Sequence, residues 1–224
     1  MNSAILYKEW LKTRKVFAIV LLLTAALAIY AVLRMNRLIE LKGVEHLWLI
    51  MLLKDNTFID MIKYSPLVAG IATGIAQMAP EMAQKRLKLT LHLPVSQMRL
   101  ITLMLGTGLA ELLAIFMMQG AIIVIYDVRI IPSELVWRVM LTAAPWYLAG
   151  LQAYLFTSAI CLEGTVARRI IIGLLGICAM LVCFVQPAME AYNGGMLAGM
   201  CIFTILLTIL SLGSVIRFKE GYQS

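Results

Sequence analysis

The sequence predicts an all-α integral membrane protein with six transmembrane helices. Of its 224 residues, 62% are hydrophobic and 14% are charged, whereas a soluble domain has about a quarter charged residues. The apolar residues gather in six long runs, which short polar segments separate. An α-helix rises about 1.5 Å per residue, so about 20 apolar residues cross the hydrocarbon core of a bilayer. We therefore expect a single transmembrane domain over residues 1–224.

The first segment, residues 1–15, is basic and amphipathic. At about 100° per residue, apolar side chains share one face and charged side chains the other; the apolar set is Leu6, Tyr7, Trp10 and Leu11, and the charged set is Lys8, Glu9, Lys12 and Lys15. This pattern predicts an interfacial elbow helix on the cytoplasmic leaflet, anchored by Tyr7, Trp10 and Leu11. The alternative is a basic segment that only sets the orientation of the chain.

The six predicted spans follow in order along the chain. They comprise residues 16–33, 59–79, 100–126, 139–162, 170–186 and 196–216. The second is the least regular, because its continuous apolar part begins at Pro66 and it includes Asp60 and Lys63. In the loop before it, residues 44–53 are apolar but too few to cross a bilayer. We expect them to lie in the outer interface or to cap the bundle.

The distribution of positive charge predicts the orientation of the chain. Six spans place residues 1–15, 80–99, 163–169 and 217–224 on one side of the membrane. These segments hold 12 of the 19 Lys and Arg, namely Lys8, Lys12, Arg14, Lys15, Lys85, Arg86, Lys88, Arg99, Arg168, Arg169, Arg217 and Lys219. Basic residues beside span ends are enriched on the cytoplasmic side, so both termini are expected in the cytoplasm. Topology thus accounts for the net charge of +7, and the expected partner is membrane lipid rather than nucleic acid.

Motifs for catalysis or metal binding are absent from the sequence. It contains no GxxxxGK[ST] phosphate loop, no HExxH and no GxSxG. His46 and His92 are predicted on opposite sides of the membrane, and the four Cys lack the spacing of metal ligands. We therefore predict no metal site, no cofactor and no catalytic residue in this chain, which is not expected to be an enzyme by itself.

Glu111 is a lone carboxyl near the middle of the third predicted span, and Gln119 lies two turns further along. A carboxyl at this depth faces the bundle interior, forms a pair or is protonated. In one interpretation the two residues line a translocation path and Glu111 couples to protons. In the other, Glu111 is a protonated carboxyl that fixes helix packing through Tyr147, Gln152 or Tyr154 of the next span. Both interpretations remain open at this stage.

Two Gly-x-x-x-Gly motifs lie in predicted spans, at Gly70–Gly74 and at Gly195–Gly199. Such motifs allow helix backbones to approach closely. The spacing is common in apolar spans, so its specificity is low. We expect these glycines to mark helix contacts within the chain; the alternative is a contact between two protomers.

The segment 80–99 between the second and third spans is the part of the chain best suited to bind a soluble partner. Its leucines alternate with polar residues, a period typical of a strand. A lone strand at a membrane surface has no pairing partner, so a short helix that ends before Pro94 is preferred. We expect its leucines to enter a groove on the partner, while Lys85 and Arg86 meet acidic residues or lipid phosphates. The alternative is an ordinary basic loop.

The order of these features resembles the permease subunits of type-2 ATP-binding-cassette (ABC) exporters over essentially the whole chain. The resemblance rests on the N-terminal LYKEWLKTRK, the six spans, and an acidic residue followed by a leucine-rich stretch and Pro-Val-Ser. The matching positions are Glu81, Leu87, Leu89, Leu91, Pro94, Val95 and Ser96. The sequence departs from the family at Lys85-Arg86, where a Gly-Thr pair is frequent.

This resemblance implies that segment 80–99 forms a cytoplasmic coupling helix, which docks on a separate ABC ATPase subunit. That partner would bind ATP and Mg, and two permease copies, identical or different, would assemble in a bacterial inner membrane. The cargo expected for a chain without a large external domain is a small, lipid-like or peptide molecule. Two other classes remain: a small ion-coupled secondary transporter that uses Glu111, and a membrane scaffold that transports nothing.

Overall fold

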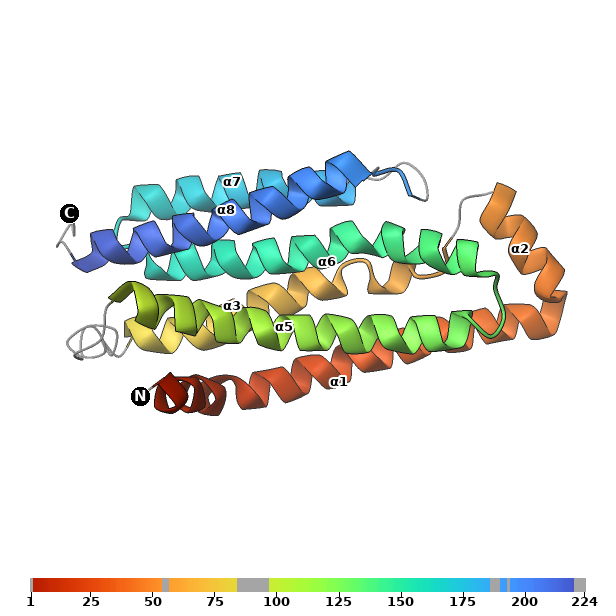
Figure 1. The fold of residues 1–224 in the computed structure, drawn as a ribbon, viewed down its shortest axis with the longest axis horizontal. Helices are drawn as coiled ribbons and strands as arrows, with labels where there is room; N and C mark the ends of the chain where they lie inside the picture. Colours follow the sequence, from red (N-terminus) through yellow and green to blue (C-terminus); the bar gives the residue numbers. More distant parts are fainter. Residues whose placement is uncertain (1, 54–56, 84–96, 186–189, 193, 220–224) are drawn as a thin grey trace.

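Long helices arranged side by side make up the protein, as seen in a computed structural model that describes residues 2–53, 57–83, 97–185, 190–192 and 194–219 (Figure 1). The helices are α1 (Asn2–Lys42), α2 (Val44–Leu53), the 3-10 helix η1 (Asp60–Ile62), α3 (Ser65–Ala83), α5 (Gln97–Asp127), α6 (Ser133–Leu162), α7 (Val166–Phe184) and α8 (Gly194–Lys219). The described ranges contain no strand. The all-α class predicted from the sequence is therefore confirmed.

Four helices are long and apolar enough to cross a membrane, and they indicate a membrane protein. They are Ser3–Lys42, Met98–Asp127, Ser133–Leu162 and Val166–Phe184. The helix α3 is not among them, and α8 has a shorter apolar stretch, Gly194–Ile209, within the residues whose side chains the structure describes. Both run alongside the four in the bundle (Figure 1). The count of six spans stays a prediction.

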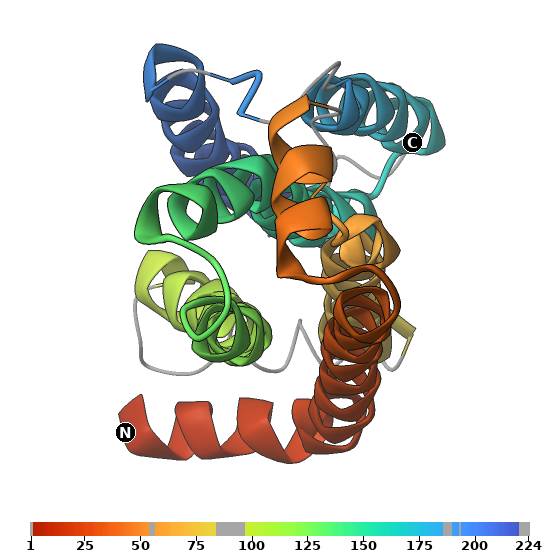
Figure 2. The same ribbon diagram turned by 90° about the vertical axis from the view of Figure 1, so that its right-hand side faces the viewer.

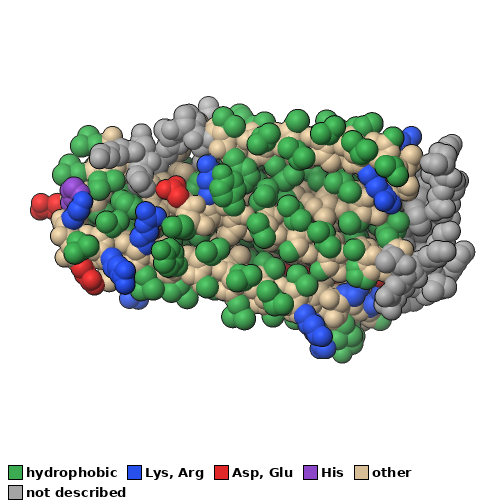
Figure 3. Space-filling model, turned by 180° about the vertical axis from the view of Figure 1, so that it is seen from behind, with side chains coloured by type: hydrophobic (Ala, Val, Ile, Leu, Met, Phe, Trp, Pro, Cys, Tyr) green, Lys and Arg blue, Asp and Glu red, His purple; other side chains and the backbone are tan. Residues whose placement is uncertain are grey.

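The surface of the bundle is apolar along its middle. Figure 3 shows hydrophobic side chains over most of one face, with Lys, Arg, Asp and Glu mainly towards the two ends. Large apolar side chains that stay exposed include Leu22 on α1, Leu174 on α7 and Ile205 on α8. A soluble monomer rarely exposes apolar patches of this extent, whereas lipid tails are a suitable solvent for them.

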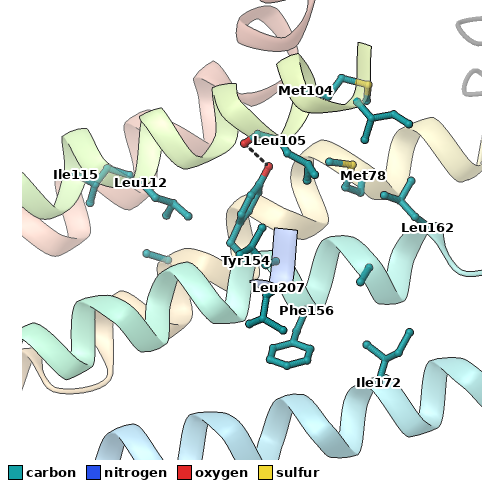
Figure 4. Packing of buried hydrophobic residues seen from close by; sticks show 14 of the residues in the cluster. Met78, Met104, Leu105, Leu112, Ile115, Tyr154, Phe156, Leu162, Ile172 and Leu207 are labelled. Atoms are coloured by element: carbon teal, nitrogen blue, oxygen red, sulfur yellow. Dashed lines mark hydrogen bonds between the residues drawn. The ribbon is translucent and has the colours of Figure 1, made fainter. Parts of the chain in front are cut away.

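The helix α6 lies at the centre of the bundle, with α3 and α5 on one side and α7 and α8 on the other. In Figure 4, Tyr154 points from α6 towards α5, where its hydroxyl oxygen lies 3.2 Å from the Leu105 carbonyl oxygen. Phe156 points towards Ile172 of α7. These four side chains are buried and belong to the main hydrophobic cluster.

Glycines let α3 approach α6 closely. A Cβ placed on Gly70 would lie 2.0 Å from the carbonyl oxygen of Gly150, and one placed on Gly74 would lie 3.0 Å from Thr157. No side chain fits at Gly70 without moving a backbone. The contact predicted within the chain for Gly70–Gly74 is therefore confirmed.

The region predicted as the second span begins irregularly. The chain forms η1, then a turn that the Ser65 hydroxyl closes by donating to the Ile62 carbonyl at 2.9 Å, and α3 starts only there. Pro66 is the second residue of α3, where a missing N–H costs nothing. The helix α2 is too short to cross a bilayer, and its buried Leu47 and Met51 close this end of the bundle.

Candidate functional site

The first part of α1 runs crosswise to the rest of the bundle before the helix turns along it (Figure 2). The term "crosswise segment" is used below for residues 2–15. Its predicted anchors Tyr7, Trp10 and Leu11 are 64%, 43% and 42% exposed. They point away from the protein, as contact with a membrane surface requires. The contact with lipid itself stays a prediction.

Part of the polar face of the crosswise segment is turned into the bundle, whereas Lys15 stays exposed. Glu9 and Thr13 are 1% exposed, and the Lys12 side chain is 13% exposed. From the sequence these charges were expected to face away from the apolar side of a helix that lies on the membrane. The structure differs because polar side chains of α3 and α5 lie directly above this face and bind it. Sequence periodicity identifies the two faces but not what covers each one.

An ion-pair cluster joins the crosswise segment to the end of α3. The Lys12 ammonium lies 2.8 Å from Glu81 Oε1 and 2.9 Å from Glu9 Oε2, and the Lys8 ammonium lies 3.0 Å from Glu81 Oε1. Burial alone would raise the pKa of Glu81, but the hydrogen bonds and charges of Lys12 and Lys8 outweigh it and hold that pKa below its ordinary value. Glu81 is therefore the anionic centre of this contact.

Glu81 is one of the residues that the sequence assigns to a partner contact. Its side chain is 0% exposed and bound to Lys8 and Lys12 of the same chain. The other predicted contact residues lie outside the described residues: Lys85, Arg86, Leu87, Leu89, Leu91, Pro94, Val95 and Ser96. The helix ends on either side of them, the last turn of α3 and the first turn of α5, lie at the same end of the bundle as the crosswise segment (Figure 1).

Gln77 of α3 connects this cluster to α5 and α6. Its amide donates to Glu9 Oε2 at 3.0 Å and to the Met104 carbonyl at 2.6 Å, and its Oε1 accepts from the Tyr154 hydroxyl at 2.7 Å. A Cβ on Gly108 would lie 2.3 Å from that hydroxyl, so glycine at this position makes room for it. This network was not predicted from the sequence. The feature of the sequence that points to it is a polar residue, Gln77, inside an apolar run.

Glu111 completes the cluster from α5. Its Oε1 forms a hydrogen bond with the Thr13 hydroxyl of the crosswise segment, and its buried Oε2 has no partner among the described residues. The structure pairs Glu111 with none of the three partners predicted on α6. Tyr154 binds Gln77, the Gln152 amide donates to Thr204 at 3.1 Å, and the Tyr147 hydroxyl has no partner among the described residues. The reason is that α1 folds back under α5 and reaches Glu111 first, which spacing along α5 does not reveal.

Gln119 belongs to a different contact from Glu111. Its amide donates to the Ser65 hydroxyl at 2.9 Å and thereby ties α5 to the start of α3. Its side chain is fully buried. The structure therefore does not bring Gln119 and Glu111 into one site.

A cavity of about 390 Å³ lies between α6, α7 and α8. Its walls are mostly apolar and include Gln152, Cys183, Gly195, Gly199, Met200 and Phe203. Ligand sites typically have this size and a few polar groups in an apolar lining. A Cβ on Gly199 would meet no described atom within 4 Å, so the contact within the chain that was preferred for Gly199 is wrong. The missing side chain widens the cavity instead. The alternative, a contact with a second protomer, stays a prediction.

No cluster of His, Cys, Asp and Glu that could hold a metal ion occurs in the described part of the chain. The cysteines at 161, 178, 183 and 201 are free thiols. Comparison of the chain with known protein families, with curated proteins and with solved structures finds no match in any of the three. The buried polar cluster and the arrangement of helices around it are therefore the basis for assigning a function.

Proposed function

We propose that the chain is the permease subunit of a type-2 ABC exporter in a bacterial inner membrane, with both termini in the cytoplasm. The observation that carries this proposal is the buried ion-pair contact of Glu81 with Lys8 and Lys12. It lies at the end of α3, directly before the segment that resembles a coupling helix. In the family that the chain resembles, the corresponding segment docks on the ATPase and follows its movement.

The contact suits a part that transmits movement. A displacement of the segment after α3 would act on Glu81, which is buried and held by two ammonium groups from the crosswise segment. Buried charges part only at a large cost in free energy, so the crosswise segment would follow. In this proposal Glu81 therefore transmits the movement within the permease, and the leucines at positions 87, 89 and 91 contact the ATPase.

The remaining subunits and ligands follow from the same proposal. ATP and Mg bind to the partner ATPase, and a second permease copy completes the transmembrane part. The helices α3 and α8 cross the membrane beside the four helices that meet the length and hydropathy criteria. The largely apolar cavity between α6, α7 and α8 favours a lipid-like molecule among the small, lipid-like and peptide cargoes.

Recovery of the native complex tests this function. The tagged chain is expressed in its source organism, extracted in a mild detergent and pulled down, and the co-purified proteins are identified. We expect an ABC ATPase with the wild type and its loss with Leu89→Asp, because a buried leucine contact does not tolerate a carboxylate. The matched control is Leu41→Asp, which makes the same change at an 81% exposed position. Leu41 lies in the last turn of α1, at the far end of that helix from the crosswise segment.

Two outcomes would contradict the proposal. If the wild type brings down no ATPase, an ion-coupled transporter that uses Glu111 or an assembly scaffold becomes the next hypothesis. If Leu41→Asp loses the ATPase as fully as Leu89→Asp, the loss reflects damage to the permease and not a contact at position 89.

A further inference from the structure

Three carboxyl groups and two ammonium groups meet under the crosswise segment. Glu9 and Glu81 each lie within 3.0 Å of a lysine ammonium. Glu111 is 8% exposed and forms no ion pair with any described residue. If all five groups were ionised, the cluster would carry an uncompensated negative charge at Glu111, which burial makes costly.

The hydrogen bonds of Thr13 also indicate that Glu111 is protonated. Its hydroxyl lies within hydrogen-bonding distance of two oxygens, Glu111 Oε1 and the Glu9 carbonyl at 3.1 Å. A hydroxyl has one hydrogen to donate, and a backbone carbonyl can only accept. Both contacts become hydrogen bonds when Thr13 donates to Glu9 and a protonated Glu111 donates to Thr13.

The second oxygen of Glu111 agrees with this arrangement. Glu111 Oε2 is buried and has no hydrogen-bond partner in the described part of the chain. Glu9 Oε1 and Glu81 Oε2 share this property, but each of those carboxyls is paired with the Lys12 ammonium through its other oxygen, whereas Glu111 is paired with no described cation. An orphaned carbonyl oxygen of a neutral acid loses far less hydration free energy than an orphaned carboxylate oxygen. The neutral acid is therefore the form that this pocket accommodates.

We propose that Glu111 and Thr13 form a proton-binding site, in which Glu111 carries one proton at neutral pH while the crosswise segment is docked. The titratable groups beside it are Glu9 of α1 and Tyr154 of α6. Lys8 and Lys12 of α1 and Glu81 of α3 lie one contact further away, where Lys12 binds both Glu9 and Glu81. When the crosswise segment moves away, water reaches the carboxyl, which loses its proton to that water. If Glu111 lost its proton in the docked state, its carboxylate would lie beside the carboxylate of Glu9, and their repulsion would weaken the docking.

This site goes beyond the proposed export function and does not depend on it. A proton bound at this place makes docking of the crosswise segment sensitive to pH, whichever partner or cargo the chain has. Proton uptake accompanies docking and proton release accompanies undocking, with no other reactant.

Infrared difference spectroscopy of the full-length chain tests the site directly. The protein is purified at neutral pH in a detergent without ester or carboxyl groups, and the spectrum of Glu111→Gln is subtracted from that of the wild type. We expect the wild type to show one additional stretching band of a protonated carboxyl. A difference spectrum that contains only carboxylate bands would overturn the proposal.

Two further variants keep the result interpretable. Thr13→Val retains Glu111 and removes its hydrogen-bond acceptor, so the same band should persist and shift; an unshifted band would disprove the pairing with Thr13. Asp127→Asn removes the other buried carboxyl of α5, which is the last residue of that helix, and identifies any band that belongs to Asp127. Because no ATPase enters these measurements, their failure would leave the export proposal untouched, and the reverse also holds.

Discussion

Two contacts hold the same bundle together by different means: the α3–α6 seam and the polar cluster under the crosswise segment. At the seam, Gly70 and Gly150 bring two backbones into direct contact, with no side chain between them. In the cluster, long polar side chains span the gap, such as Lys12 reaching Glu81 over 2.8 Å. The first contact depends on shape and the second on charge.

The difference decides what each contact permits. A close-packed seam has one good geometry, because any displacement opens a void or causes overlap. A charged contact at the end of the bundle resists separation while it is dry, and it parts only where water enters and solvates its groups. We infer that α3 and α6 always move as one body, whereas the crosswise segment follows α3 while the contact is dry and can part from it when water enters.

The largest expected effect comes from placing a side chain in the α3–α6 seam. Gly70→Leu places a Cβ 2.0 Å from a backbone oxygen, so α3 and α6 must separate. We expect a loss of about 3 kcal/mol or more in the free energy of unfolding, measured as a large fall in the melting temperature in detergent. Gly106→Leu is the control, because a Cβ there meets no described atom within 4 Å. Equal melting temperatures for the two variants would refute the seam.

Removal of one charge from the cluster has the next largest effect. Lys12→Met leaves Glu9 and Glu81 buried with less compensation, which costs about 3 kcal/mol when a buried pair is broken. Lys8→Met should cost at most about 1 kcal/mol, since the Lys8 side chain is 39% exposed. Thermal unfolding of the two variants provides the comparison. A double variant, Lys12→Met with Glu81→Gln, should regain part of the loss, because the two groups interact.

The smallest expected effect is a loss of part of the stability of the fold at acid pH. The pKa of Glu81 is held below its ordinary value of 4.5, so its ionised form stabilises the fold at neutral pH. This contribution persists as the pH falls towards 4.5 and is lost as the pH falls further, through the pKa of the folded state. The gap in melting temperature between wild type and Glu81→Gln should therefore stay constant down to about pH 4.5 and close below it. A gap that closes well above this pH would show that Lys8 and Lys12 do not hold the carboxylate.

The sequence located the apolar part of most helices because it depends on local composition, although α1 continues to Lys42, beyond the predicted end of the first span at residue 33. The apolar run that begins at Pro66 explains why α3 starts at Ser65 and not at residue 59. The stretch 44–53 was predicted as a short apolar element, and α2 has the same bounds. A glycine pair at Gly70–Gly74 was predicted at a helix contact, and it lies at one.

The candidate site was only partly predictable. Periodicity separated the two faces of residues 1–15, and the position of a lone carboxyl inside an apolar run identified Glu111 as a residue of interest. Neither gave information on the partners, because Thr13 and Glu111 are 98 residues apart and meet only where α1 folds back under α5. Glu81 was assigned to an outside partner for the same reason, since its lysines come from a distant part of the chain.

The sequence by itself determined that this is a helical membrane protein and where most of its helices run. Hydrophobicity and helix formation are local properties, which a window of about 20 residues contains. Only the tertiary structure decided which charges become buried and which carboxyl lacks a cation. Those facts depend on contacts between segments far apart in the sequence, where the direction in which α1 folds decides what each polar group meets.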